Sequence, residues 1–123
     1  MAFVLDAAYN AALAYLADNG SQLDVTSDSG TPTDLTNSLG STGLTSGDGN
    51  GDFTIQAGDV SGRKLTLAGQ TISATGTGTA TYWVLSDGAG TILAADTMDD
   101  KSVESGYDYE MPAIDIAEFR DAA

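Results

Sequence analysis

Apolar residues repeat at helical spacing only at the start of this chain, and this restriction narrows the possible folds more than any other feature. The one-sided stripe consists of Leu5, Tyr9, Leu13 and Leu16. Six alanines in the same segment add high helix propensity. The pattern predicts one helix over residues 3–19, docked through its stripe on the rest of the chain or on a neighbouring copy. Gly20 is expected to end this helix in a left-handed conformation.

After the helix, the apolar positions change to short runs with a period of two. Residues 22–27 form the first such run, in which Leu23 and Val25 alternate with Asp24 and Thr26. This alternation predicts a half-buried strand with the two apolar side chains on the core face.

Residues 28–52 are rich in Gly, Ser, Thr, Asp and Asn and are predicted to be one long loop. Residues 53–119 then read as a β-rich body of short strands separated by turns. With a length of 123 residues, the whole chain is expected to form a single domain. The predicted fold class is mainly β: an antiparallel β-sandwich or barrel with one N-terminal α-helix.

The strongest strand signal is residues 79–86, where β-branched and aromatic side chains gather. A hairpin turn is predicted at residues 87–90, with a return strand over residues 91–95. Within the first strand, Tyr82 and Trp83 are neighbours, so one is expected to face the core and the other the surface. Further short strands are predicted at residues 63–67, 71–74, 107–109 and 113–117.

The net charge of -14 is the main guide to partners. All four cations lie after residue 62, whereas the first 62 residues carry eight carboxylates. A surface of this sign repels phosphates, so no nucleic-acid or membrane partner is expected. The N-terminus lacks a secretory signal, because its start has no basic flank and Asp6 interrupts the apolar stretch. Synthesis in a cytoplasm is therefore expected.

The chain has neither cysteine nor histidine. Thiolate nucleophiles, the usual imidazole base and the common zinc ligands are thus excluded. Acidic pairs such as Asp99-Asp100 and Asp108 with Glu110 are expected by chance in a chain with 18 carboxylates. We predict that the protein is not an enzyme and assign it no catalytic residue, no cofactor and no metal ligand.

One segment matches the ligand spacing of a calcium-binding loop. Its oxygen-bearing residues are Asp48, Asn50, Asp52, Thr54, Gln56 and Asp59. The segment resembles the loops of dockerins and EF-hands, but its sixth position, which normally holds Gly, is Phe53. Moreover, no helix signal follows Asp59. A solvated turn is therefore the preferred interpretation, and a calcium-dependent adhesion module is kept as an alternative function.

Several stretches resemble small virion proteins encoded among the structural genes of tailed bacteriophages. They are the opening residues 1–8, the strand-and-turn residues 57–67 and 74–88, and the closing residues 111–116. The resemblance implies a β-rich structural subunit that decorates or cements the exterior of the capsid. It also implies that the subunit is assembled in the host cytoplasm.

The partners implied by this resemblance are the major capsid protein and copies of the chain itself. A trimer is expected, because capsid lattices offer many threefold and quasi-threefold positions. A neck or tail subunit is the nearest alternative. The acidity favours the outer surface of the shell over a position against packaged DNA.

Overall fold

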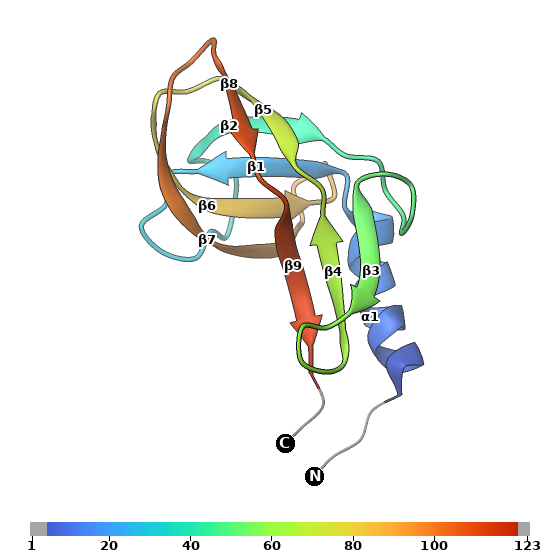
Figure 1. Ribbon diagram of the computed structural model, residues 1–123. Coiled ribbons are helices and arrows are strands. Elements are labelled where there is room, and N and C mark those ends of the chain that lie inside the picture. Colours follow the sequence, from blue (N-terminus) through green and yellow to red (C-terminus); the bar gives the residue numbers. More distant parts are fainter. Residues whose placement is uncertain (1–4, 121–123) are drawn as a thin grey trace.

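The computed structural model describes residues 5–120, in which one helix precedes nine strands (Figure 1). The elements are α1 (Asp6–Asn19), β1 (Gln22–Thr26), β2 (Ser38–Gly43), β3 (Phe53–Ala57), β4 (Arg63–Leu67), β5 (Gln70–Ala74), β6 (Gly78–Ser86), β7 (Ile92–Val103), β8 (Asp108–Met111) and β9 (Ile114–Phe119). Neighbouring strands in both sheets run antiparallel. The prediction of a mainly antiparallel β fold with one N-terminal helix is confirmed.

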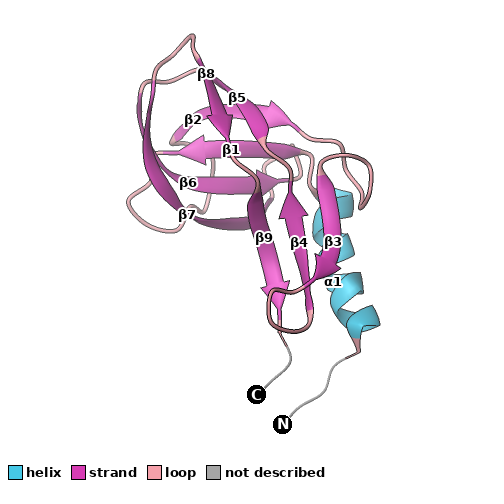
Figure 2. Cartoon of the chain, in the orientation of Figure 1, coloured by secondary structure: helices cyan, strands magenta, loops and turns pink. Residues whose placement is uncertain are grey.

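The strands form a six-stranded sheet in the order β7-β6-β1-β2-β5-β8 and a three-stranded sheet in the order β3-β4-β9. The larger sheet curls into a half-barrel, and the smaller sheet extends from it beside α1 (Figure 2). Strand β1 lies at the centre of the curl, with Val25 opposite Gly40 of β2 on one side and Trp83 of β6 on the other.

One two-stranded ladder runs from the smaller sheet into the larger one. In the smaller sheet Leu67 of β4 lies opposite Ile114 of β9, and in the larger sheet Gln70 of β5 lies opposite Met111 of β8. Two residues separate β4 from β5, and two separate β8 from β9, so the register is the same on both sides of the bend. Figure 1 shows β4 leading into β5 and β8 leading into β9. Pro112 lies in this gap, where its missing N–H interrupts the ladder.

Helix α1 packs on β3 and β4 through one side. Leu13 and Ala17 are fully buried, and Leu16 packs partly buried against the same core. Tyr9 stacks on Phe119 of β9, with ring centroids 5.6 Å apart. The predicted docking is thus confirmed for the later part of the stripe, but the prediction for Leu5 is wrong. Leu5 precedes the first turn and is 63% exposed.

The end of α1 corrects the role predicted for Gly20. The helix stops at Asn19 as expected, but Gly20 has φ -70° and ψ 121°, an extended conformation that any residue can adopt. Space is the reason for glycine here. A Cβ atom would lie 2.9 Å from the Phe53 ring and 3.0 Å from the Leu85 side chain, so a larger residue would push α1 away from the core. Residues 3–4 of the predicted helix lie outside the described residues.

The prediction of an unbroken loop over residues 28–52 is wrong, because β2 occupies Ser38–Gly43. Leu39 is the apolar anchor of β2, and a Gly-rich, Ser-rich strand with one such residue has little intrinsic β preference. Strand β2 is held between β1 and β5 by backbone pairing, which the local sequence pattern does not predict. The predicted turn at residues 87–90 is confirmed, but the return strand extends to Val103 rather than ending at residue 95.

Replacing Leu13 by Ala should lower the free energy of unfolding by about 2–5 kcal/mol, because the side chain is fully buried and its loss leaves a cavity. The same change at Leu5 is the matched control, since that side chain is mostly exposed and should cost less than about 0.5 kcal/mol. Chemical denaturation of both variants measures the difference. Equal losses would contradict this docking of α1.

Candidate functional site

The most distinctive local feature is a break between two strands that are neighbours in sequence. Strands β7 and β8 are joined by residues 104–107, where the Tyr107 N–H donates to the Glu104 carbonyl (3.1 Å). A turn this short usually joins two paired strands. Within residues 5–120, however, β7 pairs with β6 and β8 pairs with β5, so the two form opposite edges of the curled sheet. The half-barrel therefore stays open along a seam between them.

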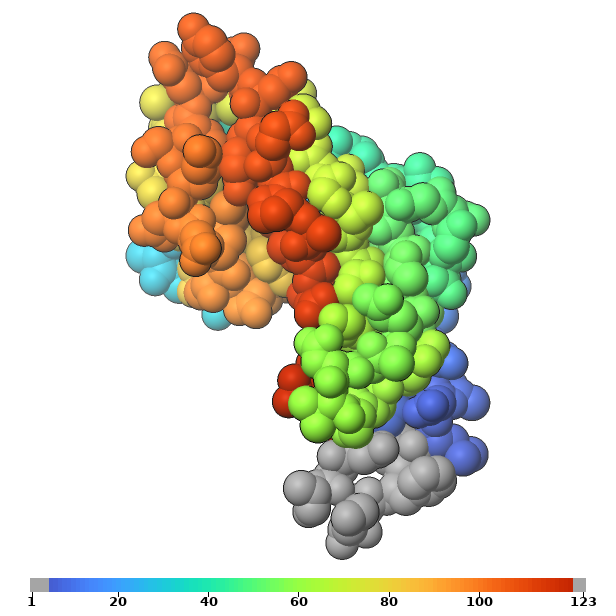
Figure 3. Space-filling model, viewed as in Figure 1, coloured from blue at the N-terminus to red at the C-terminus, as the bar shows by residue number. Residues whose placement is uncertain are grey.

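The seam contains two open hollows of about 430 and 330 Å³ that share Tyr109. We call them together the seam groove. The larger hollow, next to the turn, is lined by Lys101, Ser102, Val103, Glu104, Tyr107, Asp108, Tyr109 and Glu110. The smaller one is lined by Trp83, Thr97, Met98, Asp99, Tyr109, Met111, Pro112 and Ile114. Figure 3 shows the two flanks of the groove, β7 in orange and β8 with β9 in red. By residue type, the larger hollow is thus lined mainly by charged and polar residues and the smaller one mainly by apolar residues.

Tyr109 lies where the two halves meet. Partial burial, followed by the nearby charge of Asp99, raises the pKa of its phenol above the ordinary value. The phenol is therefore neutral at physiological pH and keeps a proton to donate. The Lys101 ammonium lies 5.9 Å from the centre of the Tyr109 ring, within range of a cation–π interaction. As predicted, one residue of the Tyr82–Trp83 pair faces the core: Trp83 is 4% exposed and forms part of the groove.

The backbone of β8 offers hydrogen-bonding groups to the seam. The Ala74 N–H of β5 donates to the Tyr107 carbonyl (3.2 Å), and this sets the alternation of the ladder. Tyr109 and Met111 accordingly direct their backbone groups toward β5. Asp108 and Glu110, the residues between them, direct theirs toward the open edge.

The β7 edge differs, because the strand is distorted beside the groove. Ala80 of β6 pairs with Lys101 and Tyr82 pairs with Thr97, so Met98, Asp99 and Asp100 form a bulge opposite a single β6 residue. Bulges and charged side chains are common protections of an edge strand against adventitious pairing. The predicted acidic pair Asp99-Asp100 thus lies on this protected edge.

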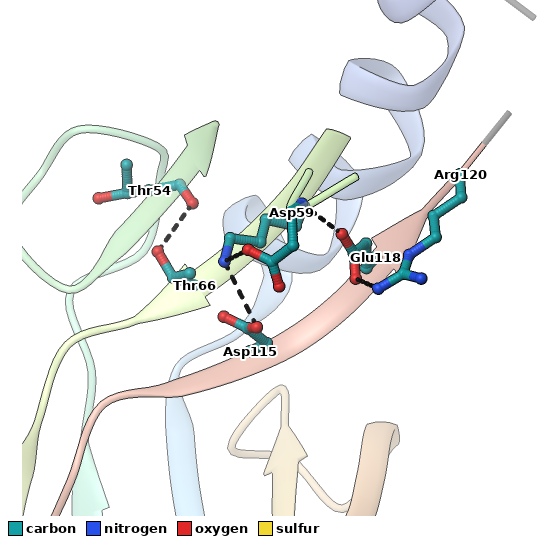
Figure 4. Close-up of polar contacts among 7 residues, drawn as sticks. Thr54, Asp59, Thr66, Asp115, Glu118 and Arg120 are labelled. Carbon is teal, nitrogen blue, oxygen red and sulfur yellow. Dashed lines mark hydrogen bonds and ion pairs between the residues drawn. The ribbon is translucent and has the colours of Figure 1, made fainter. Parts of the chain in front are cut away.

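A second cluster of charged groups lies at the far end of the smaller sheet (Figure 4). The Lys64 ammonium is 2.7 Å from Asp59 and 3.5 Å from Asp115. Glu118 accepts from the Asp59 backbone N–H (2.7 Å) and pairs with Arg120 (3.0 Å). The hydrogen bond from Lys64 lowers the pKa of Asp59, and the hydrogen bond from the Asp59 N–H, with Arg120, lowers the pKa of Glu118.

The calcium-like segment does not bring its oxygens together. Asp48 accepts from the Ile55 N–H (2.8 Å), Asp52 accepts from the Thr45 N–H (2.7 Å), and Asp59 is bound to Lys64. The residue at the sixth position, Phe53, is fully buried in β3 and has no positive φ. The turn is instead made upstream by positive-φ glycines at positions 47, 49 and 51. Among residues 5–120, no three acidic side chains are grouped closely enough to hold a metal ion.

Two features escaped the sequence analysis. Asp24 was expected on the solvent side of β1, yet it is 3% exposed and accepts from Ser38 Oγ (2.6 Å) and Gln22 Nε2 (2.7 Å). These neutral donors satisfy the buried carboxylate, which therefore has a structural explanation. The seam groove itself has no local sequence signal, because it results from the pairing of β7 with β6 and of β8 with β5.

Comparisons with protein-family models, with curated proteins and with solved structures returned no match. In the described part of the chain, no helix is long and apolar enough to span a membrane.

The Asp59–Lys64 pair leads to a prediction about pH. Because the pKa of Asp59 is below its ordinary value of 3.8, its pairing stabilises the fold above that pH, and this contribution is lost as the pH falls through the folded-state pKa. Titration of the carboxyl carbons by NMR should place the Asp59 pKa below 3.8, and Lys64→Gln should raise it toward 3.8. Asp34 is the control, because its pKa is lowered by the Thr36 backbone N–H. An unchanged Asp59 pKa in Lys64→Gln would contradict the pairing.

Proposed function

We propose that this chain is a structural subunit of a tailed-phage particle that binds the exterior of the capsid in many copies and cements it. The observation that best supports the proposal is the seam groove, where an open strand edge and an apolar floor lie side by side in a small β protein. Open strand edges are surfaces on which other protein chains can pair. The strand-and-turn stretches that resemble small virion proteins point the same way.

The distribution of charge supports contact between copies at one particular end. The N-terminus of α1, the β3–β4 turn and the end of β9 meet at the bottom of Figure 1. Val60 is 77% exposed in that turn, and Phe119 is 37% exposed opposite Arg63. Three of the four cations (Arg63, Lys64 and Arg120) also belong to this end, where they balance the carboxylates of Asp59, Asp115 and Glu118. Copies of an otherwise acidic chain therefore repel one another least here. We propose this end as the contact surface of the trimer.

Contact between copies can be tested by Val60→Asp, which adds a charge to a side chain that the fold does not need. The variant should sediment as a monomer at concentrations where the wild type forms trimers. Tyr15→Asp is the matched control, because Tyr15 is 62% exposed on α1, and it should leave the trimer intact. Equal sedimentation of wild type and Val60→Asp would contradict the proposed surface.

Salt should strengthen this association, because at about 0.1 M the screening length is only about 10 Å and repulsion between the acidic bodies is reduced. Sedimentation of the wild type across a salt series measures the effect. Weaker association with added salt would instead indicate that charge attraction holds the copies together.

Binding to the shell is tested by adding purified protein to capsids assembled without it. Saturation at hundreds of copies, on the order of the number of lattice positions, with a more heat-resistant shell is the expected result. Binding at about a dozen copies at the tail vertex would favour a neck or tail subunit. Absence of binding would refute the assignment to the capsid exterior.

A further inference from the structure

We propose that the seam groove binds an extended segment of another protein chain, which adds to β8 as a new strand and carries basic side chains among apolar ones. The inference goes beyond the proposed place in a phage particle, because it concerns the chemistry of the groove and does not depend on what kind of assembly the chain joins. It rests on three properties of the groove: its backbone edge, its apolar floor and its charge.

The backbone edge is that of β8. Asp108 and Glu110 direct their N–H and carbonyl groups into the seam, as the ladder between β5 and β8 requires. An incoming strand can pair with these groups, which is how extended peptides add to sheet edges. The opposite edge is less suited to pairing, because the bulge at residues 98–100 distorts it. The added strand therefore pairs with β8 and faces the bulge of β7 across the seam.

The apolar floor selects an extended chain with side chains in alternation. Successive side chains of a strand point to opposite faces, so every second one would enter the groove. Those that enter meet Trp83, Tyr109, Met111 and Pro112, which line the smaller hollow. Aromatic rings offer a large apolar contact area, and methionine side chains adapt to apolar anchors of different shape. The partner therefore carries apolar residues at every second position of the inserted stretch.

The charge of the groove selects a basic partner. Asp99, Glu104, Asp108 and Glu110 line the two hollows, and Lys101 is the cation beside them. These five residues sum to a net charge of -3, within a chain whose net charge is -14. A second copy is a poor occupant, because it carries the same excess of carboxylates. Lysine or arginine on the outward positions of the partner would face Asp108 and Glu110.

The chain contains its own reporter of binding, because Trp83 is its single tryptophan and lines the groove. The probe is a peptide of about nine residues that alternates Val and Lys, long enough for a full strand. A matched peptide alternates Val and Glu. The Val/Lys peptide should shift Trp83 fluorescence with saturation, and the Val/Glu peptide should not. Equal binding of the two peptides, or no shift with either, would overturn the proposal.

A charge-reversing variant tests whether the peptide binds in the groove. Asp108→Lys should weaken the Val/Lys peptide about fivefold, the scale of losing one exposed attraction and gaining one repulsion. Asp18→Lys is the control, because it makes the same charge change on an exposed position of α1 and should leave the affinity nearly unchanged. Similar weakening by both variants would show that only the overall charge matters and would overturn the assignment to the groove.

Strand addition has its own test, because it depends on backbone donors of the peptide. Two further Val/Lys peptides carry N-methyl groups on one or the other set of alternate amides, which removes those donors and leaves the side chains in place. At least one of them should lose binding. If both bind as well as the unmethylated peptide, the segment does not pair with β8 and the proposal fails.

Discussion

The architecture depends on the pairing of β8 with β5. Strand β8 does not pair with β7, although β7 directly precedes β8 in the sequence. The ladder between β4 and β9 continues into the ladder between β5 and β8 without a change of register across the Pro112 bend. In this arrangement Tyr109 and Met111 pair with β5 and β7 pairs with β6, so the outer edges of β7 and β8 lie unpaired on the two sides of the seam. The larger sheet therefore curls as a half-barrel and stays open at one side.

The smaller sheet and α1 give the ladder its support. Phe53 is fully buried between α1 and the larger sheet, close to Gly20 and Leu85, so it couples the helix to both sheets. The bend thereby becomes part of a single core cluster that includes Leu13, Leu67 and Trp83. Side chains packed at this density leave little freedom to slide one strand past another. The seam groove lies directly against this cluster, because Trp83 and Met111 belong to both.

The sequence predicted the elements whose formation is controlled by a local residue pattern. The helix, β1, the strong strand around Trp83 and the hairpin turn at residues 87–90 all have clear local signals, and the structure confirms them. The Asp87 side chain explains the turn, because it accepts from the backbone N–H groups of Ala89 (2.8 Å) and Thr91 (3.1 Å).

Features set by distant residues could not be predicted in this way. Strand β2 has only Leu39 as an apolar anchor and exists because β1 and β5 flank it. The carboxylate of Asp24 looked solvent-facing by alternation, but Ser38 and Gln22 satisfy it in a buried position. Likewise, the aromatic and acidic residues of the seam groove are spread over residues 83–114 and meet only because of strand order. The residue types could be read from the sequence, but their proximity in the folded chain could not.

The central claim is that β8 has one paired and one open edge, and amide hydrogen exchange of the free protein tests it most directly. The N–H groups of Tyr109 and Met111 point to β5 and should exchange slowly, whereas those of Asp108 and Glu110 point into the seam and should exchange quickly. This alternation along four consecutive residues is the predicted result. Slow exchange at all four amides would mean that β8 is paired on both sides, which would close the seam and contradict the account.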